Sequence, residues 1–424
     1  MKTYQEFTPA ERKAELAALL AKYEEEKTKG YQLNMARGVP APDQLDLSME
    51  MLAQDPQSLI HTAKGADARN YGELSGIDEA KALFASLLGV ENENIIIGGQ
   101  SSLEMMYNCV MRAWVFGVAG GSRPWGQQGK VKFLCPVPGY DRHFRITEAF
   151  GFEMINIPMS PEGPDMALVK QYVENDASVK GIWCVPKYSN PQGYTYSAAT
   201  VEAFAALKPA ADDFRIFWDN AYMVHGFREK DDELANIFDC CKKYGNADMV
   251  YEFCSTSKVT FPGGGVAALA SGKNNIALIL KQMGVQTIGY DKLNQLRHVS
   301  FLKDASGVAA HMKRQAAILA PKFDTVLETL RTELGGLGVG SWTEPNGGYF
   351  VCFTGLKNTA KRAVQLCAEA GVKLTGAGAP FPYGLDPEDN VIRIAPSFPT
   401  PAQLADSIRL FCLAERIAAL ETMI

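Results

Sequence analysis

The chain is 424 residues long, with 47% hydrophobic and 21% charged residues, a formal net charge of -6 and an isoelectric point near 5.6. This length is too great for one ordinary hydrophobic core and predicts a larger and a smaller domain. The acidic balance excludes a basic surface of the kind that binds nucleic acid or an anionic membrane, so neither is expected as a partner.

The N-terminus and the cysteines both indicate a cytoplasmic protein. The chain does not begin with a basic segment followed by an apolar one, and no stretch reaches the roughly 18 apolar residues of a membrane span. The nine cysteines include no CxxC pair and no His/Cys cluster at zinc spacing. We therefore expect free thiols and no bound metal.

The first predicted element is an amphipathic helix. Thr8, Pro9 and Glu11 form a capping box with proline at the first helical position, and apolar residues recur at helical spacing until Gly30. Short apolar runs then alternate with longer amphipathic segments, and these runs lie at 95–97, 131–135, 181–185, 216–218 and 249–254. This alternation predicts an α/β fold whose mostly parallel central sheet is covered by helices.

After residue 300 the pattern changes to that of a smaller α+β domain. Helical patterns occur at 305–335 and 358–371, strand patterns near 348–353 and 391–394, and a closing helix begins at Pro401. We expect three segments: an N-terminal helix and segment that joins the small domain (1–49), a large domain (50–300) and a small domain (301–424).

Polar residues follow several of the predicted strands, and ligands of open α/β sheets bind just past the carboxyl ends of strands. The segment from Gly98 to Ser102 leads into a helix and suits a phosphate, although an ordinary helix cap fits equally well. The segment from Pro138 to His143 offers an aromatic face, a base and a cation, or a plain turn. The segment from Asn190 to Gly193 is composed of the usual residues of a β-turn.

The next two strand ends carry a carboxylate and an amine. Asp219 ends a very apolar strand, where a buried carboxylate needs a cationic partner such as a protonated pyridine nitrogen. Lys258 follows another apolar strand among hydroxyl groups, where a lowered pKa would free its amine for imine formation.

These motifs resemble, in order and spacing, those of the class I and II fold-type I pyridoxal-phosphate aminotransferases. The resemblance covers nearly the whole chain and is carried by NPxG at 190–193, DxAY at 219–222 and SxSK at 255–258. It implies that Lys258 carries pyridoxal 5′-phosphate as a Schiff base, that Asp219 pairs with the ring nitrogen, and that Tyr222 hydrogen-bonds the ring oxygen. The other implied cofactor contacts are Asn190 on the ring oxygen, Tyr140 stacked on the ring, His143 orienting Asp219, and Gly99, Gln100, Ser101 and Ser255 on the phosphate.

The resemblance also implies the substrate contacts and the assembly. Arg393 matches the arginine that clamps the substrate α-carboxylate, since its planar fork suits a carboxylate, although a surface ion pair would also explain it. Gly38 belongs to the segment that folds over the substrate. Asn190 is implied as a further substrate contact. Tyr71 is expected to reach the phosphate from a second subunit, which implies a homodimer with active sites at its interface.

One departure from the family pattern concerns the phosphate. Most members follow the lysine with GxRxG, whose arginine binds the phosphate, whereas this chain has Gly263-Gly264-Gly265-Val266-Ala267. We expect Ser255, Ser257 or Thr260 with backbone amides, or a cation elsewhere, to take its place.

This departure, together with SSLEMMYN at 101–108, YDRHF at 140–144 and NYGELSGI at 70–77, is most similar to the type Ic aspartate aminotransferases. The resemblance implies ping-pong transfer of the amino group of aspartate or glutamate to a 2-oxo acid. A second cation would then bind the side-chain carboxylate. The first candidate is Arg142, and the alternatives are Arg37, Arg145, and the partner subunit's Lys292 or the partner subunit's Arg297.

Other functions remain open at this stage. Transamination of aromatic or alanine-like substrates and C–S β-elimination would use the same residues, and an apolar pocket would favour them. A non-catalytic regulator that binds the same cofactor is less favoured, because only about 30 residues precede the glycine segment and the charge is acidic.

Overall fold

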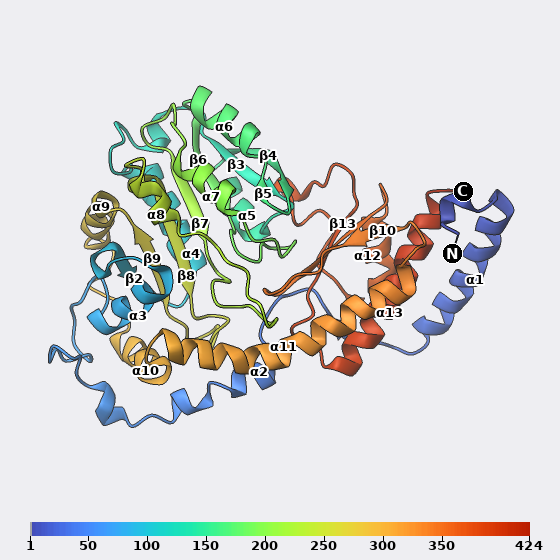
Figure 1. The fold of residues 1–424 in the computed structure, drawn as a ribbon, viewed down its shortest axis with the longest axis horizontal. Helices are drawn as coiled ribbons and strands as arrows, with labels where there is room; N and C mark the ends of the chain where they lie inside the picture. The colour runs from blue at the N-terminus through green and yellow to red at the C-terminus, as the bar shows by residue number, and fades with distance from the viewer. Residues whose placement is uncertain (1) are drawn as a thin grey trace.

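The computed structural model describes residues 2–424 and shows a larger and a smaller lobe (Figure 1). The larger lobe is built on an eight-stranded sheet of order β2-β9-β8-β7-β6-β3-β4-β5. Its strands are β2 (Ile95–Ile97), β3 (Lys132–Val137), β4 (Glu153–Ser160), β5 (Gly163–Pro164), β6 (Val179–Cys184), β7 (Arg215–Asp219), β8 (Val250–Ser255) and β9 (Ala267–Ser271).

The predicted mostly parallel sheet is confirmed. The pairs from β8 through β7, β6 and β3 to β4 are all parallel. Strand β9 runs antiparallel to both β2 and β8, and β5 runs antiparallel to β4. Because β2 and β8 both oppose β9, they point the same way, so the carboxyl ends of β2, β3, β6, β7 and β8 share one edge of the sheet.

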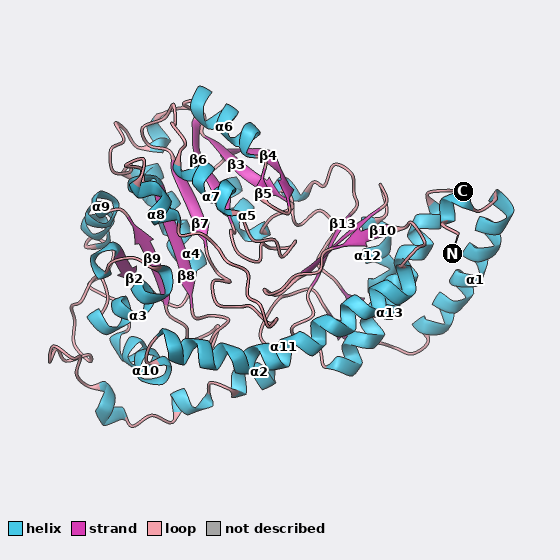
Figure 2. Ribbon diagram, in the orientation of Figure 1, coloured by secondary structure: helices cyan, strands magenta, loops and turns pink. Residues whose placement is uncertain are grey.

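Helices cover both faces of this sheet (Figure 2), which explains why its central strands are buried along their whole length. One face packs against α3 (Asp78–Leu88), α6 (Met166–Asn175), α7 (Ala198–Ala205) and α8 (Ile237–Lys242). The other face packs against α4 (Ser102–Val115), α5 (Asp141–Ala149) and α9 (Lys273–Met283).

The smaller lobe has a three-stranded antiparallel sheet of order β10-β11-β13. Its elements are β10 (Gly340–Trp342), β11 (Val351–Gly355), α12 (Ala360–Glu369), β13 (Val391–Ile394) and α13 (Pro401–Glu421). Strand β1 (Leu33–Asn34) pairs with β12 (Val372–Lys373), and helix α1 (Pro9–Lys27) lies beside α13 (Figure 1). The N-terminal segment therefore contacts the smaller lobe.

Helix α11 (Ala305–Leu334) runs along both lobes (Figure 1). The remaining helices are α2 (Pro42–Asp46) and α10 (Lys292–Leu302), together with short 3-10 helices at Tyr4–Glu6, Met49–Leu52, Pro56–Leu59, Asn92–Asn94, Trp125–Gln127, Ala247–Met249 and Pro382–Gly384. The predicted capping box at the start of α1 is confirmed, because the Thr8 side chain accepts a hydrogen bond from the Glu11 backbone amide.

Two expectations about cysteines and membranes can be compared with the structure. All nine cysteines are free thiols, as predicted. Within residues 2–424, every helix is too short or too polar to cross a bilayer.

Glu415 is a carboxyl group buried in the middle of α13. Its side chain is fully enclosed, the Thr359 hydroxyl lies 3.3 Å from Oε1, and Oε2 has no hydrogen-bond partner among residues 2–424. Burial raises the pKa of Glu415 to about 8. The folded protein therefore holds this carboxyl group neutral at a pH where the unfolded chain would ionise it.

We expect Glu415→Gln to stabilise the protein in a pH-dependent way. Because the folded pKa lies above the unfolded one, the wild type loses stability as pH rises from about 4.5 to about 8. A glutamine does not titrate, so the advantage of the variant should grow over this range and reach on the order of 5 kcal/mol above pH 8.

Denaturant unfolding at several pH values measures this effect, with Glu25→Gln on the exposed face of α1 as the control. A stability difference between Glu415→Gln and wild type that stays constant from pH 5 to pH 9 would contradict the assignment.

Candidate active site

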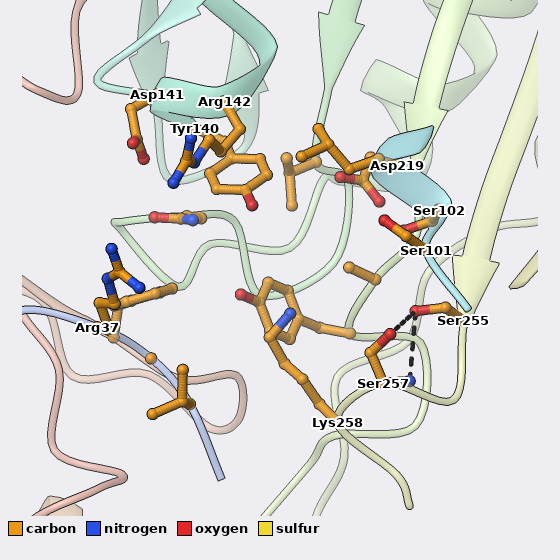
Figure 3. A pocket seen from close by; sticks show the side chains of 18 of the residues that line it. Arg37, Ser101, Ser102, Tyr140, Asp141, Arg142, Asp219, Ser255, Ser257 and Lys258 are labelled. Carbon is orange, nitrogen blue, oxygen red and sulfur yellow. Dashed lines mark hydrogen bonds between the residues drawn. The ribbon is translucent and has the colours of Figure 1, made fainter. Parts of the chain in front are cut away.

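A cavity of about 310 Å³ lies at the carboxyl edge of the large sheet and is lined by residues of both lobes (Figure 3). Figure 3 shows Lys258 reaching into it, with Tyr140, Asp141 and Arg142 along one wall. Most of the sequence-predicted site residues line it: Gly38, Ser101, Tyr140, Arg142, Asn190, Asp219, Tyr222, Ser255, Ser257, Lys258 and Arg393.

Four predicted residues do not line this cavity: Gly99, Gln100, His143 and Tyr71. Gln100 touches the site through its backbone, whose carbonyl accepts a hydrogen bond from the Ser257 hydroxyl at 3.0 Å. The Gly99 carbonyl accepts from the Ala267 amide and so ties this loop to β9. Tyr71 is 83% exposed and lies on a separate surface beside Lys292, so its role toward a second subunit stays a prediction.

Asp219 is the last residue of β7, which is buried along its whole length. Its Oδ2 lies 2.9 Å from Nε2 of His143, and the His143 ring is stacked on Trp183 with centroids 4.5 Å apart. Its Oδ1 is buried without a hydrogen-bond partner among residues 2–424. A buried carboxylate in this state suits a cationic ligand at the free oxygen.

Lys258 lies in the loop after β8, and its Nζ is 5.0 Å from the centroid of the Tyr222 ring. Burial lowers the pKa of the Lys258 amine below its usual range, and the negative charge of Asp219 opposes this shift in part. A lowered pKa leaves more of the amine neutral, which is the form that attacks a carbonyl and accepts a proton.

Tyr140 and Tyr222, together with Phe350, form the aromatic part of the cavity wall. Burial, followed by the negative charges of Asp219 and Asp141, raises the pKa of Tyr140 to about 12. Burial also raises the pKa of Tyr222 well above its usual range. Both phenols therefore remain protonated near neutral pH and can donate hydrogen bonds.

The end of the cavity next to the amino end of α4 is rich in hydroxyl groups. Ser101 is the N-cap of α4, and its side chain accepts a hydrogen bond from the Glu104 amide. The Ser255 hydroxyl donates to the Ser257 hydroxyl at 3.0 Å (Figure 3). Thr260, the alternative phosphate contact, is buried outside the cavity with its hydroxyl 2.9 Å from Nε2 of His298. Hydroxyl groups and the amino end of a helix suit an anion such as a phosphate.

Arg393 on β13 brings a guanidinium group to the other end of the cavity. Its Nη1 lies 3.0 Å from Oδ1 of Asp141 and donates to Oδ1 of Asn190 at 3.2 Å. Its Nη2 donates to the Thr375 hydroxyl, and the group lies over the Phe350 ring. Gly38 is packed so closely that an added Cβ would come within 2.5 Å of that ring.

Two further guanidinium groups line the cavity, those of Arg37 and Arg142. Arg145, an alternative to Arg142, instead pairs with Glu148 at 2.8 Å and has a 70% exposed side chain outside the cavity. The structure therefore narrows the candidate cations within one chain to Arg37 and Arg142.

Several residues at the site were not predicted as site residues. Asp141, Thr375 and Phe350 all contact Arg393, and His225 lies behind Tyr222. Burial and the charge of Lys258 lower the pKa of His225 to about 3, so this ring is neutral. Asp141 lies between the predicted residues Tyr140 and Arg142. One sequence gives no signal that Asp141 contacts Arg393, which is 252 positions away.

Together these groups form one site with three chemical regions. A nucleophilic amine faces a buried carboxylate with a free oxygen, hydroxyl groups border one end, and guanidinium groups border the other. This arrangement can hold an aromatic cation that bears a phosphate, together with a carboxylate substrate.

Comparisons with known proteins identify the family of this chain. A family model described as aspartate amino-transferase matches residues 7–424. An aspartate aminotransferase from Corynebacterium glutamicum is 43% identical over 383 residues, which cover 90% of this chain and 88% of that protein.

Solved structures give the same result for the fold. The crystal structure of an aspartate transaminase from Corynebacterium glutamicum has a TM-score of 0.97 and 40% identity, and the match covers 100% of this chain and 99% of that one. The α-aminoadipate aminotransferase from Thermus thermophilus shares the fold at a TM-score of 0.73 and 20% identity, over 95% of this chain and 96% of that one. The expected fold-type I aminotransferase fold is thereby confirmed, and the chain belongs to the aspartate aminotransferase family.

Proposed function

We propose that this protein is a pyridoxal-phosphate aminotransferase that moves the amino group of aspartate or glutamate to a 2-oxo acid by a ping-pong mechanism. The observation that carries the proposal is that Lys258 and Asp219 face one cavity together with the guanidinium groups of Arg37, Arg142 and Arg393.

The residues present suit pyridoxal 5′-phosphate. The unpartnered Oδ1 of Asp219 is available to a protonated ring nitrogen, and Tyr140 offers a ring face beside it. Ser101, Ser255 and Ser257 offer hydroxyl groups to a phosphate at the amino end of α4, where the helix dipole favours an anion. When bound, this cofactor supplies an electron sink for the negative charge that develops at the substrate Cα.

The chain's own residues would then divide the work. Lys258 holds the cofactor in the resting enzyme and moves the proton at the substrate Cα, a task that its lowered pKa favours. Asp219, held by His143, keeps the ring nitrogen protonated. Asn190 and Tyr222 hydrogen-bond the ring oxygen, and Arg393 binds the substrate α-carboxylate in two-point fashion.

The charges of the cavity favour a dicarboxylic substrate. Its lining contains the cations Arg37, Arg142, Lys258 and Arg393 but only the anions Asp141 and Asp219. This surplus of positive charge balances a phosphate and a second substrate carboxylate, whereas aromatic or alanine-like amino acids and C–S β-elimination substrates bring no such charge. Arg142 is the first candidate for the side-chain carboxylate, and Arg37 is the second.

A homodimer is part of the proposal. The Tyr71 side chain is exposed on the surface of one chain, where it is free to reach the phosphate of a second copy. A tyrosine from the second copy would add a neutral donor to a phosphate site that lacks the usual arginine, since Val266 occupies that stretch.

A half-reaction tests the activity. Holoenzyme mixed with L-aspartate and no acceptor should release at most one equivalent of oxaloacetate per site, because the amino group stays on the enzyme. Addition of 2-oxoglutarate should then start continuous turnover, and Lys258→Ala should give neither. If the holoenzyme instead releases thiol, pyruvate and ammonia continuously from an L-cysteine S-conjugate without an acceptor, and forms no oxaloacetate from L-aspartate, it is a C–S β-lyase and the proposal is overturned.

Substitution of Arg142 tests the substrate class. Arg142→Gln should lower kcat/KM for L-aspartate by at least about 30-fold, the effect of about 2 kcal/mol from a lost charged hydrogen-bond pair. The kcat/KM for L-alanine, which has no side-chain carboxylate, should change far less.

Arg145→Gln on the same helix is the matched control and should leave kcat/KM for both substrates nearly unchanged. If Arg142→Gln lowers kcat/KM equally for both substrates, Arg142 does not bind the side-chain carboxylate. Arg37→Gln is then the variant to measure.

A further inference from the structure

The guanidinium group of Arg393 is already paired with a carboxylate of the protein itself. Oδ1 of Asp141 lies 3.0 Å from Nη1 of Arg393, whose side chain is only 7% exposed. Asn190 accepts a second hydrogen bond from Nη1 and Thr375 accepts one from Nη2, whereas Nε has no partner among residues 2–424. A carboxylate of the protein itself therefore lies against Arg393, where a carboxylate ligand would bind.

The position of Asp141 in the fold explains how its carboxylate reaches Arg393. It is the first residue of α5, directly after Tyr140, and the smaller lobe brings β13 to the same cavity. The amino end of a helix stabilises a negative charge, so Asp141 remains favourably placed as a carboxylate even without Arg393. Arg37 and Arg142 line the same cavity and offer it further positive charge.

A buried guanidinium group without an anion would be costly, because its hydration is lost without compensation. The ion pair with Asp141 offsets this cost, and the Arg393 guanidinium group lies over the Phe350 ring. A substrate carboxylate that binds across Nη1 and Nη2 of Arg393 meets Asp141 at Nη1, and two carboxylates at one nitrogen repel each other. Substrate binding must therefore exchange one ion pair for another.

We propose that Asp141 is a positioning residue that stands in for the substrate α-carboxylate at Arg393 and is displaced when the substrate binds. The inference rests on the proposed function, because it takes Arg393 as the α-carboxylate site. Asp141 thereby weakens the binding of every carboxylate ligand, and a ligand without a carboxylate gains nothing from displacing it. The ion pair between Asp141 and Arg393 keeps Arg393 oriented but lowers the affinity of the site for carboxylate ligands.

Equilibrium binding of a dicarboxylate tests this inference without turnover. Succinate, which has no amino group to transfer, is titrated into the holoenzyme by calorimetry. Asp141→Asn keeps the size and a hydrogen-bond acceptor but removes the charge, so the Kd for succinate should fall at least about tenfold. In steady state, KM for L-aspartate should fall while kcat changes by less than about threefold.

Two further variants separate competition from other effects. Glu148→Gln removes a negative charge from the same helix outside the cavity and should leave the Kd unchanged. Asp141→Glu keeps the charge and should bind succinate as the wild type does or more weakly. A Kd for Asp141→Asn that is unchanged or raised, or a Kd for Asp141→Glu as low as that of Asp141→Asn, would overturn the inference.

The same measurements distinguish failure of the proposed function from failure of the role assigned to Asp141. If the wild-type holoenzyme neither binds succinate nor transaminates L-aspartate, the dicarboxylate assignment and the inference fall together. If the wild type does both and only the tighter binding of Asp141→Asn is missing, the proposed function stands and the role of Asp141 alone is wrong.

Discussion

The buried carboxylate of Asp219 is the constraint on which the rest of the site depends. One oxygen contacts His143, which is fixed by stacking on Trp183, and the other has no partner among residues 2–424. A charge removed from water in this way needs a cation to compensate it. The parallel sheet supplies the setting, because β7 delivers Asp219 to the same edge at which β8 delivers the loop of Lys258. The fold thus creates the need for a cationic ring and the amine that can hold it.

The same reasoning about charge extends to the substrate end. Arg393, like Asp219, is buried, but its compensation is already present as Asp141. In the proposed function the two ends of the cavity therefore differ. Asp219 would pair with a cation of the cofactor, whereas Arg393 already pairs with Asp141, which the substrate would displace. This difference accords with a cofactor that stays bound through many cycles and substrates that exchange in each one.

Much of the fold and the site could be predicted because the relevant signals are local. Continuous apolar runs predicted β6, β7 and β8, and the polar residues at or just after the ends of β7 and β8 pointed to Asp219 and Lys258. Asn190 was assigned only through the family resemblance, and it lines the same cavity. The antiparallel strand β9 was not foreseen, since its short run of small residues has no period that sets its direction. The pairing of Asp141 with Arg393 and the burial of Glu415 depend on long-range packing, which no local pattern encodes. The division at residues 49 and 300, the type Ic subgroup and the role of Tyr71 stay predictions.

The protonation state of the cofactor ring tests the central claim most directly. Holoenzyme prepared with pyridoxal phosphate labelled with nitrogen-15 in the ring reports by NMR whether that nitrogen carries a proton. We expect a protonated nitrogen in the wild type throughout the neutral pH range and its loss in Asp219→Ala, where the compensating charge is gone. A wild-type ring nitrogen that is unprotonated at neutral pH would contradict the pairing with Asp219, and with it the reading of the free Oδ1 as a cofactor contact.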